Sequence, residues 1–167
     1  VEGPVIDATA GLGVDAGVAA TLGRDVLCLE RDRVVHAMLV DALSRAETEA
    51  EKAVAARMHL RCIDACAVLQ DLPDPWSRPG AIMLDPMFPP RRRQSALPPK
   101  AMQRLRQLLD AGPEEDIGGL LAAAHATVAR RVVLKRPPEA VVDYGACGAP
   151  TYAIETKLLR WEVWDRG

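Results

Sequence analysis

Val5-Ile-Asp-Ala-Thr-Ala-Gly-Leu-Gly13 is a short apolar run that ends at an acidic residue and passes into a glycine turn. Its continuation, Gly11-Leu-Gly-Val-Asp-Ala16, fits the pattern G-x-G-x-x-A, whose small residues allow a tight turn between a strand and a helix. We therefore expect a strand over residues 4–7 and a helix from Val14 to Leu22. In a parallel sheet such a turn lies at the carboxyl end of a strand, where nucleoside cofactors bind.

Short β-branched runs alternate with helical patterns along the rest of the chain. This order predicts an α/β fold with a mostly parallel sheet and helices on both faces. We expect further strands over residues 26–30, 59–63, 81–84 and 131–134, and then an antiparallel hairpin of residues 151–156 and 159–164.

Three helices are expected from apolar residues at a spacing of three and four. Asp32 can cap the first of them, and residues 47–52 are expected to be its solvated charged tail. The side chains expected to be buried are Val35, Met38, Leu39, Ala42 and Leu43 in the first helix, Met102, Leu105, Leu108 and Leu109 in the second, and Leu120, Leu121, Ala124 and Val128 in the third, over residues 117–129.

Composition limits the class of protein. A chain of 167 residues with 49% apolar residues is long enough for one hydrophobic core. A net charge of −2 argues against a uniformly basic nucleic-acid binder. The four cysteines show no metal-ligand spacing, so we expect no metal and mostly buried, reduced thiols. No apolar run reaches the ~20 residues of a membrane span, and we expect a cytoplasmic protein that does not contact membranes.

Carboxylates near the glycine turn indicate which cofactor binds there. Glu30 ends the second expected strand, where it can accept hydrogen bonds from ribose hydroxyls. Asp7 would repel a pyrophosphate but attract the sulfonium and amino groups of S-adenosylmethionine (SAM), and Asp15 adds negative charge nearby. These residues, with Gly11 and Gly13, favour SAM. A nicotinamide-dependent oxidoreductase, which shares the turn and Glu30, is the alternative.

Asp85-Pro-Met-Phe-Pro89 follows the fourth expected strand and indicates methyl transfer to the exocyclic amine of a base. The lone pair of that nitrogen is delocalised into the ring, so the amine must be held and polarised before it attacks. Asp85 and the carbonyl group of Pro86 can accept its two N–H bonds, and Phe88 can stack on the base. We predict these three as the catalytic residues.

A basic strip follows this turn, with six basic residues and no acidic one between Pro86 and Leu109. Such a strip suits a phosphate backbone. The predicted RNA contacts are Arg91, Arg92, Arg93 and Lys100, extended by Lys135 and Arg136 at the end of the fifth strand. A non-catalytic RNA-binding module on the same fold is a second alternative.

Taken together, the segments at 5–13, 29–31, 84–89 and 133–137 resemble the J-type family of bacterial small-subunit ribosomal RNA (guanine-N2) methyltransferases. The resemblance implies a SAM-dependent, Rossmann-like class I domain with a seven-stranded sheet, acting on ribosomal RNA or the small ribosomal subunit. It implies cofactor contacts at Val14, Asp15, Glu30, Arg31, Cys66, Ala67 and Asp85. It also implies that residues 1–167 form a single methyltransferase domain that lacks an N-terminal segment of the family.

Overall fold

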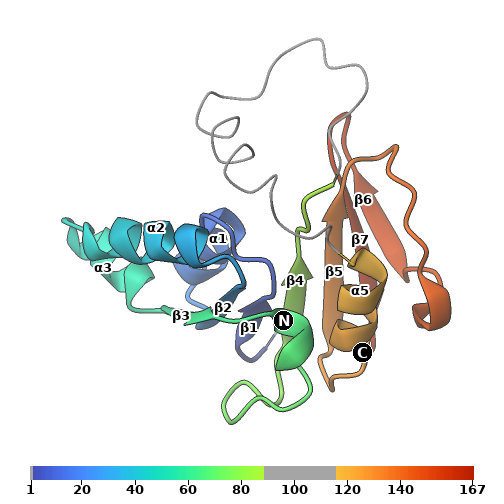
Figure 1. Ribbon diagram of the computed structural model, residues 1–167, viewed down its shortest axis with the longest axis horizontal. Coiled ribbons are helices and arrows are strands. Elements are labelled where there is room, and N and C mark those ends of the chain that lie inside the picture. The colour runs from blue at the N-terminus through green and yellow to red at the C-terminus, as the bar shows by residue number, and fades with distance from the viewer. Residues whose placement is uncertain (1, 89–115) are drawn as a thin grey trace.

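The computed structural model describes residues 2–88 and 116–167, which form one seven-stranded sheet with helices on both faces (Figure 1). The strand order is β3-β2-β1-β4-β5-β7-β6, with the first five parallel and β7 antiparallel to both of its neighbours. The strands are β1 Val5–Asp7, β2 Val26–Glu30, β3 Met58–Cys62, β4 Ala81–Leu84, β5 Arg131–Arg136, β6 Tyr152–Glu155 and β7 Arg160–Asp165. The predicted α/β class, with its C-terminal hairpin, is confirmed.

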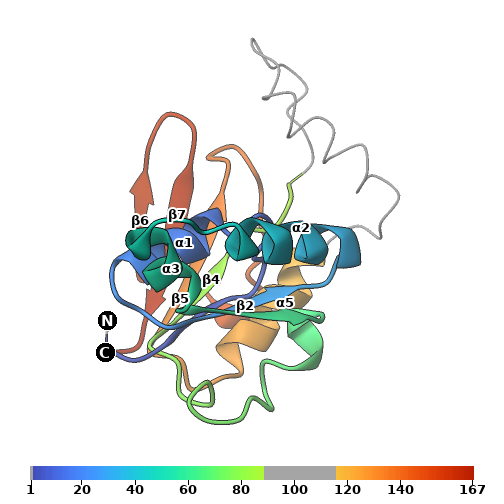
Figure 2. The same ribbon diagram turned by 90° about the vertical axis from the view of Figure 1, so that its left-hand side faces the viewer.

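Helices cover the two faces of the sheet unequally (Figure 2). Helices α1 (Val14–Thr21), α2 (Arg33–Ser44) and α3 (Glu49–Ala55) lie on one face, and α5 (Ile117–His125) lies on the other. The short 3₁₀ turns η1 (Ala65–Ala67) and η2 (Gly145–Cys147) both pack against α5.

Alternation along the strands divides the buried side chains into two cores. Ile6, Leu27 and Leu29 belong to the core beneath α5, whereas Val26 and Cys28 belong to the core beneath α1. Because successive residues of a strand point to opposite faces, the register fixes which face the residue after each strand occupies. This rule places the polar residues at the strand ends.

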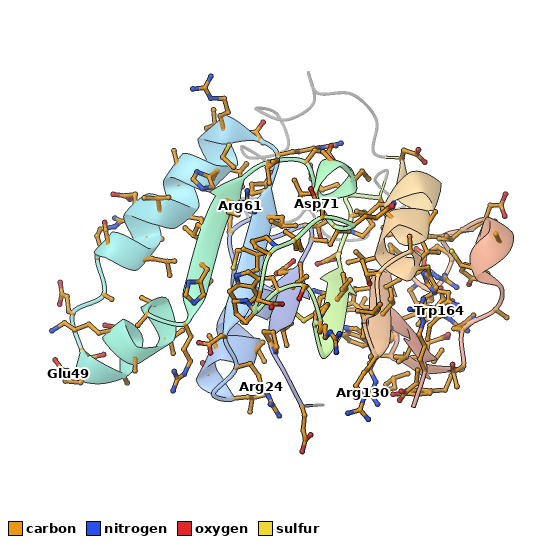
Figure 3. All side chains as sticks on the ribbon, turned by 90° about the horizontal axis from the view of Figure 1, so that it is seen from below. Arg24, Glu49, Arg61, Asp71, Arg130 and Trp164 are labelled. Carbon is orange, nitrogen blue, oxygen red and sulfur yellow. The ribbon has the colours of Figure 1, made fainter. Side chains whose placement is uncertain are left out.

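Figure 3 shows the side chains on the fold, seen from below the view of Figure 1. It labels Arg24 and Arg130, which lie just before β2 and β5, and Trp164 of β7, which belongs to the core beneath α5. Trp164 is buried, its indole N–H donates to the carbonyl oxygen of Gly148 at 3.0 Å, and its ring meets those of His125 and Tyr144 edge-on.

One expected element is wrong. The charged tail expected at residues 47–52 is a separate helix, α3, that begins with a capping box. Thr48 Oγ1 accepts from the Glu51 N–H at 3.2 Å, and Glu51 Oε2 accepts from the Thr48 N–H at 2.9 Å. The spacing Thr48-Glu-Ala-Glu51 was a visible signal for this start.

Several expected burials are also wrong. Met38 is 43% exposed and Ala42 is exposed, because α2 covers the end of the sheet and only its inner side contacts strands. Val128 is 66% exposed, because α5 ends at His125 and does not continue to residue 129. Of the cysteines only Cys28 is buried; Cys62 and Cys66 are exposed and Cys147 is intermediate.

Within residues 2–88 and 116–167, no helix is long and apolar enough to cross a membrane. The same part of the chain has no group of three or more histidine, cysteine or acidic side chains that could hold a metal ion. The helix expected around Met102, Leu105, Leu108 and Leu109 lies outside the described residues.

Candidate active site

The candidate site lies where the chain reverses its direction across the sheet. From β1 the chain continues to β2 and β3 on one side, and then returns to β4 and β5 on the other. The carboxyl ends of β1 and β4 therefore form the topological switch point, at which open α/β sheets bind their ligands. Asp7 is the last residue of β1, and Asp85 directly follows β4.

Three strand ends place carboxylates on the α1 side of the sheet. Asp7 is two residues after Val5, and Glu30 is two residues after Cys28; Val5 and Cys28 both belong to the core beneath α1. Asp85 is two residues after Met83, which packs against the same core. Asp15, in the first turn of α1, adds a fourth carboxylate above this edge.

Lys135 connects two of these carboxylates. It stands next to the end of β5, and its Nζ donates to Asp15 Oδ2 at 2.8 Å and to Asp85 Oδ2 at 2.9 Å. The side chain of Lys135 is only 18% exposed, against 35% for Asp15 and 43% for Asp85. The three residues come from α1, β5 and the segment after β4, so the ion pairs tie the helix to the sheet edge.

The glycine turn has the geometry that its sequence predicts. Gly11 and Gly13 have φ angles of 53° and 76°, in the left-handed region that favours glycine. A Cβ atom on Gly13 would lie 2.7 Å from Leu39 Cδ1 and 3.0 Å from Met58 Cε, so the turn also packs tightly beneath α2. These two constraints explain why small residues are needed here.

Glu30 holds the turn in place. Its Oε2 accepts from the Gly11 N–H at 2.8 Å, and its Oε1 accepts from the Asp32 N–H at 2.7 Å. Each oxygen keeps a second lone pair for a further donor. The carboxylate thus joins the glycine turn to the start of α2, where Asp32 caps the helix as expected.

Thr9 was not predicted as a site residue. Its Oγ1 accepts from the Asp85 N–H at 2.6 Å, and its own N–H donates to Asp7 Oδ1 at 3.2 Å. Thr9 therefore connects the carboxylate of Asp7 to the main chain of Asp85. A hydroxyl side chain among the small apolar residues of Asp7-Ala-Thr-Ala-Gly11 was the available signal.

The site favours a bound cation. Burial raises the pKa of Asp7 to about 7; the Thr9 N–H opposes this, and the charges of Asp15, Asp85 and Glu30 add to it. Burial also raises the pKa of Asp85, against the lowering effect of Lys135. A cationic ligand would relieve the repulsion among these carboxylates, whereas a pyrophosphate would increase it.

Comparison with known proteins identifies the family. A family model described as "Putative SAM-dependent methyltransferase" matches residues 1–166. Ribosomal RNA small subunit methyltransferase J of Rhodopseudomonas palustris is 43% identical over 164 residues, which cover 97% of this chain and 76% of the relative. The chain belongs to this methyltransferase J family.

Two further relatives agree. Ribosomal RNA small subunit methyltransferase J of Ectopseudomonas mendocina is 42% identical over 165 residues, covering 97% of this chain. The crystal structure of a SAM-dependent methyltransferase from Neisseria gonorrhoeae is 32% identical, with a TM-score of 0.72, and the match covers 98% of this chain and 65% of that one. This chain spans 60% of the length of the Ectopseudomonas relative. The family's dependence on SAM gives no support to the nicotinamide alternative.

The other residues predicted to bind the cofactor are spread along the edge formed by the carboxyl ends of the parallel strands. Val14 is 72% exposed and lines, with Gly13, a hollow of about 450 Å³ on the outer side of α1. Arg31 is exposed directly after β2. Cys66 and Ala67 are exposed on η1, whose N-cap Asp64 accepts from the Cys66 N–H at 2.8 Å.

The predicted catalytic turn is described as far as Phe88. Asp85 and Met87 are exposed, Pro86 is buried and Phe88 is half-buried, so the side chains of the turn alternate between solvent and the protein. Arg91, Arg92, Arg93 and Lys100, the predicted RNA contacts, lie outside the described residues.

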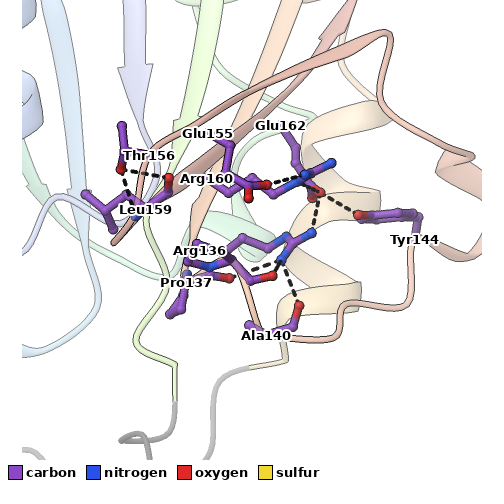
Figure 4. A network of polar contacts seen from close by, with 10 residues as sticks. Arg136, Pro137, Ala140, Tyr144, Glu155, Thr156, Leu159, Arg160 and Glu162 are labelled. Atoms are coloured by element: carbon purple, nitrogen blue, oxygen red, sulfur yellow. Dashed lines mark hydrogen bonds and ion pairs between the residues drawn. The ribbon is translucent and has the colours of Figure 1, made fainter. Parts of the chain in front are cut away.

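Arg136, which was predicted to contact RNA, lies in a buried network. Arg136 is 8% exposed and is held inside the protein (Figure 4). Its Nη2 contacts Glu162 Oε1 at 2.5 Å, and its Nη1 donates to the carbonyl oxygens of Pro137, Pro138 and Ala140 at 3.0, 3.1 and 2.8 Å. The contacts of this guanidinium group are thus made within the protein.

Lys135 was likewise predicted to contact RNA. Its charge faces Asp15 and Asp85 and is mostly shielded from solvent. The two basic residues at the end of β5 therefore point to opposite faces, as alternation requires: Lys135 belongs to the candidate active site and Arg136 to a buried network.

Proposed function

We propose that the protein transfers a methyl group from SAM to the exocyclic N2 amine of a guanine in small-subunit ribosomal RNA. The observation that carries the proposal is Asp85, held at the switch point of a methyltransferase fold together with the carboxylates of Asp7, Asp15 and Glu30; these four residues form an acidic cluster. Membership of the methyltransferase J family supports the choice of ribosomal RNA as the substrate and of the cytoplasm as the place of action.

The acidic cluster fits the chemistry of SAM. Asp7, Asp15, Glu30 and Asp85 surround one edge, and the raised pKa of Asp7 reflects burial and mutual repulsion that the hydrogen bond from the Thr9 N–H offsets only in part. When bound there, SAM supplies the methyl group and leaves as the neutral thioether. Glu30 keeps lone pairs for the ribose hydroxyls while it holds Gly11.

The residues after β4 orient the acceptor. Asp85 Oδ2 is occupied by Lys135, which leaves Oδ1 to accept an N–H of the guanine amine. The carbonyl oxygen of Pro86 accepts the second N–H, and Phe88 stacks on the base. The nitrogen becomes acidic once it is methylated, so its proton can pass to water and no strong base is needed. Most of the rate acceleration then comes from positioning.

Phosphate contacts are proposed for the basic strip. Arg91, Arg92, Arg93 and Lys100 follow the catalytic turn directly in the sequence, so they can hold the RNA backbone while the base enters the site. Replacing the three arginines by alanine tests this, because each lost phosphate contact makes the salt dependence of RNA affinity shallower by a slope of roughly 0.7.

The test of the proposed reaction compares two carboxylate variants. Asp85→Ala is expected to lower methyl transfer by about a hundredfold or more, because the amine is no longer held for attack. Asp165→Asn is the matched control: it removes a carboxylate paired with Arg131 at the opposite end of β5, and is expected to retain the parental rate.

The assay uses SAM labelled on its methyl group, with small-subunit ribosomal RNA and with assembled subunits as acceptors. Nucleoside analysis of the product is expected to show N2-methylguanosine. Parental activity in folded Asp85→Ala would overturn the role of Asp85. RNA binding without any methyl transfer by the parental protein would instead favour the non-catalytic RNA-binding module.

A further inference from the structure

Lys135 occupies a position that the proposed reaction does not itself require. Residues Leu84 and Leu134 are paired in the register of β4 and β5, so Asp85 and Lys135 stand side by side one residue further along. On its other side Lys135 is paired with Trp161 of β7, which carries no charge. The lysine side chain therefore lies at the boundary between the acidic cluster and the antiparallel part of the sheet.

The contacts of Lys135 fix two groups at once. Its Nζ lies 2.8 Å from Asp15 Oδ2 and 2.9 Å from Asp85 Oδ2, and its side chain is 18% exposed. Asp85 is also held through its backbone, because its N–H donates to Thr9 Oγ1 at 2.6 Å. The carboxyl group of Asp85 is thus restrained on one oxygen and the main chain of the same residue is anchored to the segment after β1.

We propose that Lys135 is a positioning residue for the methyl transfer: it holds one oxygen of Asp85 so that the other can orient the acceptor amine, and it fixes the first turn of α1 through Asp15. This inference rests on the proposed function, because it concerns the same site. It assigns the lysine to the reaction and not to the binding of phosphates.

The electrostatics of the site support this role. The charged groups that act on Asp85 are Lys135 from β5, Asp15 from α1 and Asp7 from β1, and Glu30 from β2 acts in turn on Asp7. Burial raises the pKa of Asp85, the hydrogen bond and charge of Lys135 lower it, and the charge of Asp15 raises it.

Lys135 itself stays protonated. Burial lowers its pKa, but its hydrogen bonds to Asp15 and Asp85 and their charges outweigh burial, so the pKa is raised. Without the ammonium group the ionised form of Asp85 would be less favourable, and its pKa would rise further. A protonated carboxyl group can no longer accept an N–H with equal strength, so the acceptor amine would be oriented poorly at low pH.

The experiment measures kcat for methyl transfer at saturating SAM and RNA between pH 5 and pH 9. For Lys135→Gln the acidic limb of the profile is expected to move to higher pH, and the ratio of kcat at pH 5.5 to kcat at pH 8.5 to fall roughly threefold or more, since an opposite charge at this distance moves a carboxyl equilibrium by at least tenfold. Lys135→Arg, which keeps the charge, is expected to restore most of the parental profile.

Arg131→Gln is the matched control. Arg131 lies on the same strand and the same face as Lys135 and forms an ion pair with Asp165, away from the carboxyl end of β5. Its loss is expected to lower stability and to leave the pH profile of kcat unchanged. Asp15→Asn adds a variant of opposite sign: it removes a carboxylate that raises the pKa of Asp85, so the acidic limb should move to lower pH.

A second measurement does not depend on catalysis. The Asp85 carboxyl carbon is titrated by NMR in the parental protein and in Lys135→Gln, with Asp85→Asn used to assign the signal. An upward shift of the Asp85 pKa in Lys135→Gln supports the inference even if the parental protein transfers no methyl group, in which case only the proposed function fails.

Two results would overturn the inference. One is an unmoved acidic limb together with an unmoved Asp85 titration in folded Lys135→Gln. The other is a Lys135→Gln variant whose affinity for SAM increases while kcat and its pH profile stay parental, because that result would make the lysine a competitor of the cofactor's cationic groups and not a positioning residue.

Discussion

Asp7 is the most buried carboxyl group of the candidate site, with 3% of its surface exposed. Burial raises its pKa to about 7, so a large fraction is protonated in the free protein at pH 6.5. A cationic cofactor favours the ionised form. Binding of SAM is therefore expected to release a proton from this residue.

Calorimetry tests this prediction when SAM binding is measured at pH 6.5 in buffers with different enthalpies of ionisation. The parental protein is expected to show a binding enthalpy that depends on the buffer, with the sign of proton release, and an affinity that rises between pH 6 and pH 8. Asp7→Asn, which keeps the shape of the neutral acid, should lose most of this dependence. Equal enthalpies in all buffers would contradict the assignment.

The sequence located the acidic residues of the site but not their connections. Asp7, Glu30 and Asp85 were predicted because each ends or follows an expected strand. The ion pairs of Lys135 were not predicted, because they depend on the register of β5 against β4 and on the position of α1, and neither is encoded in the residues around it. Because successive side chains of a strand point to opposite faces of the sheet, the sequence alone could have placed Lys135 and Arg136 on different faces.

At the scale of elements, some boundaries of the helices can be recognised in the sequence and others cannot. Local signals such as the Asp32 cap and the Thr48–Glu51 box start helices, and both can be recognised in the sequence. At the end of α5 the guanidinium group of Arg166 donates to the carbonyl oxygens of His125 and Thr127 at 2.6 and 2.7 Å, in addition to the local bond from Thr127 Oγ1 to the carbonyl oxygen of Ala124. The bonds from Arg166, 41 residues beyond His125, cannot be recognised in the sequence around the helix end.

Two glycines at helix α1 allow the effect of backbone geometry to be measured apart from that of helix propensity. In Gly13→Ala the new Cβ would meet Leu39 Cδ1 at 2.7 Å, and the residue has a φ of 76°, so the free energy of unfolding should fall by about 1–3 kcal/mol. Gly17 lies inside α1, and a Cβ atom added there would have no other atom within 4 Å. Gly17→Ala should therefore raise stability by roughly 0.5–1 kcal/mol.

Denaturant unfolding of the two variants, at fixed pH and without SAM, gives the comparison. SAM affinity provides a second readout, because Gly13→Ala is expected to weaken it by displacing the turn, while Gly17→Ala should leave it unchanged. Equal stability of the two variants would show that the turn can relax and that its close packing beneath α2 carries little energy.

At the scale of the whole molecule, one buried network fastens the antiparallel strands to the parallel sheet. Glu162 Oε1 accepts from Arg136 Nη2, from the Tyr144 hydroxyl at 2.7 Å and from Arg160 Nε at 2.9 Å, and Arg160 continues to Glu155 (Figure 4). Burial raises the pKa of Glu162, but these hydrogen bonds outweigh burial and lower it. The network joins β5, β6, β7 and the segment that leads to η2.

Glu162→Gln is expected to lower the free energy of unfolding by about 3–5 kcal/mol at pH 7, because it leaves the charge of Arg136 buried without its counterion. Glu155→Gln, at the half-exposed end of the same network, should cost less than about 1 kcal/mol. A folded-state pKa below the ordinary value of 4.5 means that the contribution of Glu162 is present above pH 4.5 and is lost as the pH falls.

Asp7 affects the pH dependence of the free energy of unfolding in the opposite direction to Glu162. Its folded-state pKa is raised from 3.8 to about 7, so its contribution is fully present below 3.8 and is lost as the pH rises through about 7. Thermal unfolding across this range checks both signs: the difference between parental protein and Glu162→Gln should shrink in acid, and Asp7→Asn should flatten the decline towards neutral pH. A difference for Glu162→Gln that grew as the pH fell would contradict the network's assigned role.

The residues next to the two ends of the chain meet at the edge where the parallel strands begin. Gly80 N–H donates to the carbonyl oxygen of Pro4 at 2.8 Å, Arg130 N–H donates to that of Pro79 at 3.4 Å, and Arg166 N–H donates to that of Arg130 at 2.9 Å. Asp85 lies at the opposite end of the parallel strands. The six residues of β5 span about 20 Å between these two ends.

Residues 1–167, produced as a chain of their own, are suited by this arrangement to attachment to a surface. A biotinylated peptide or a fluorescent domain fused after Gly167 would start on the side remote from the acidic cluster, so that a layer of protein coupled through this end would present its strand carboxyl ends to the solution. Surface-based measurements of SAM and RNA binding could then be made without a linker that crosses the mouth of the site.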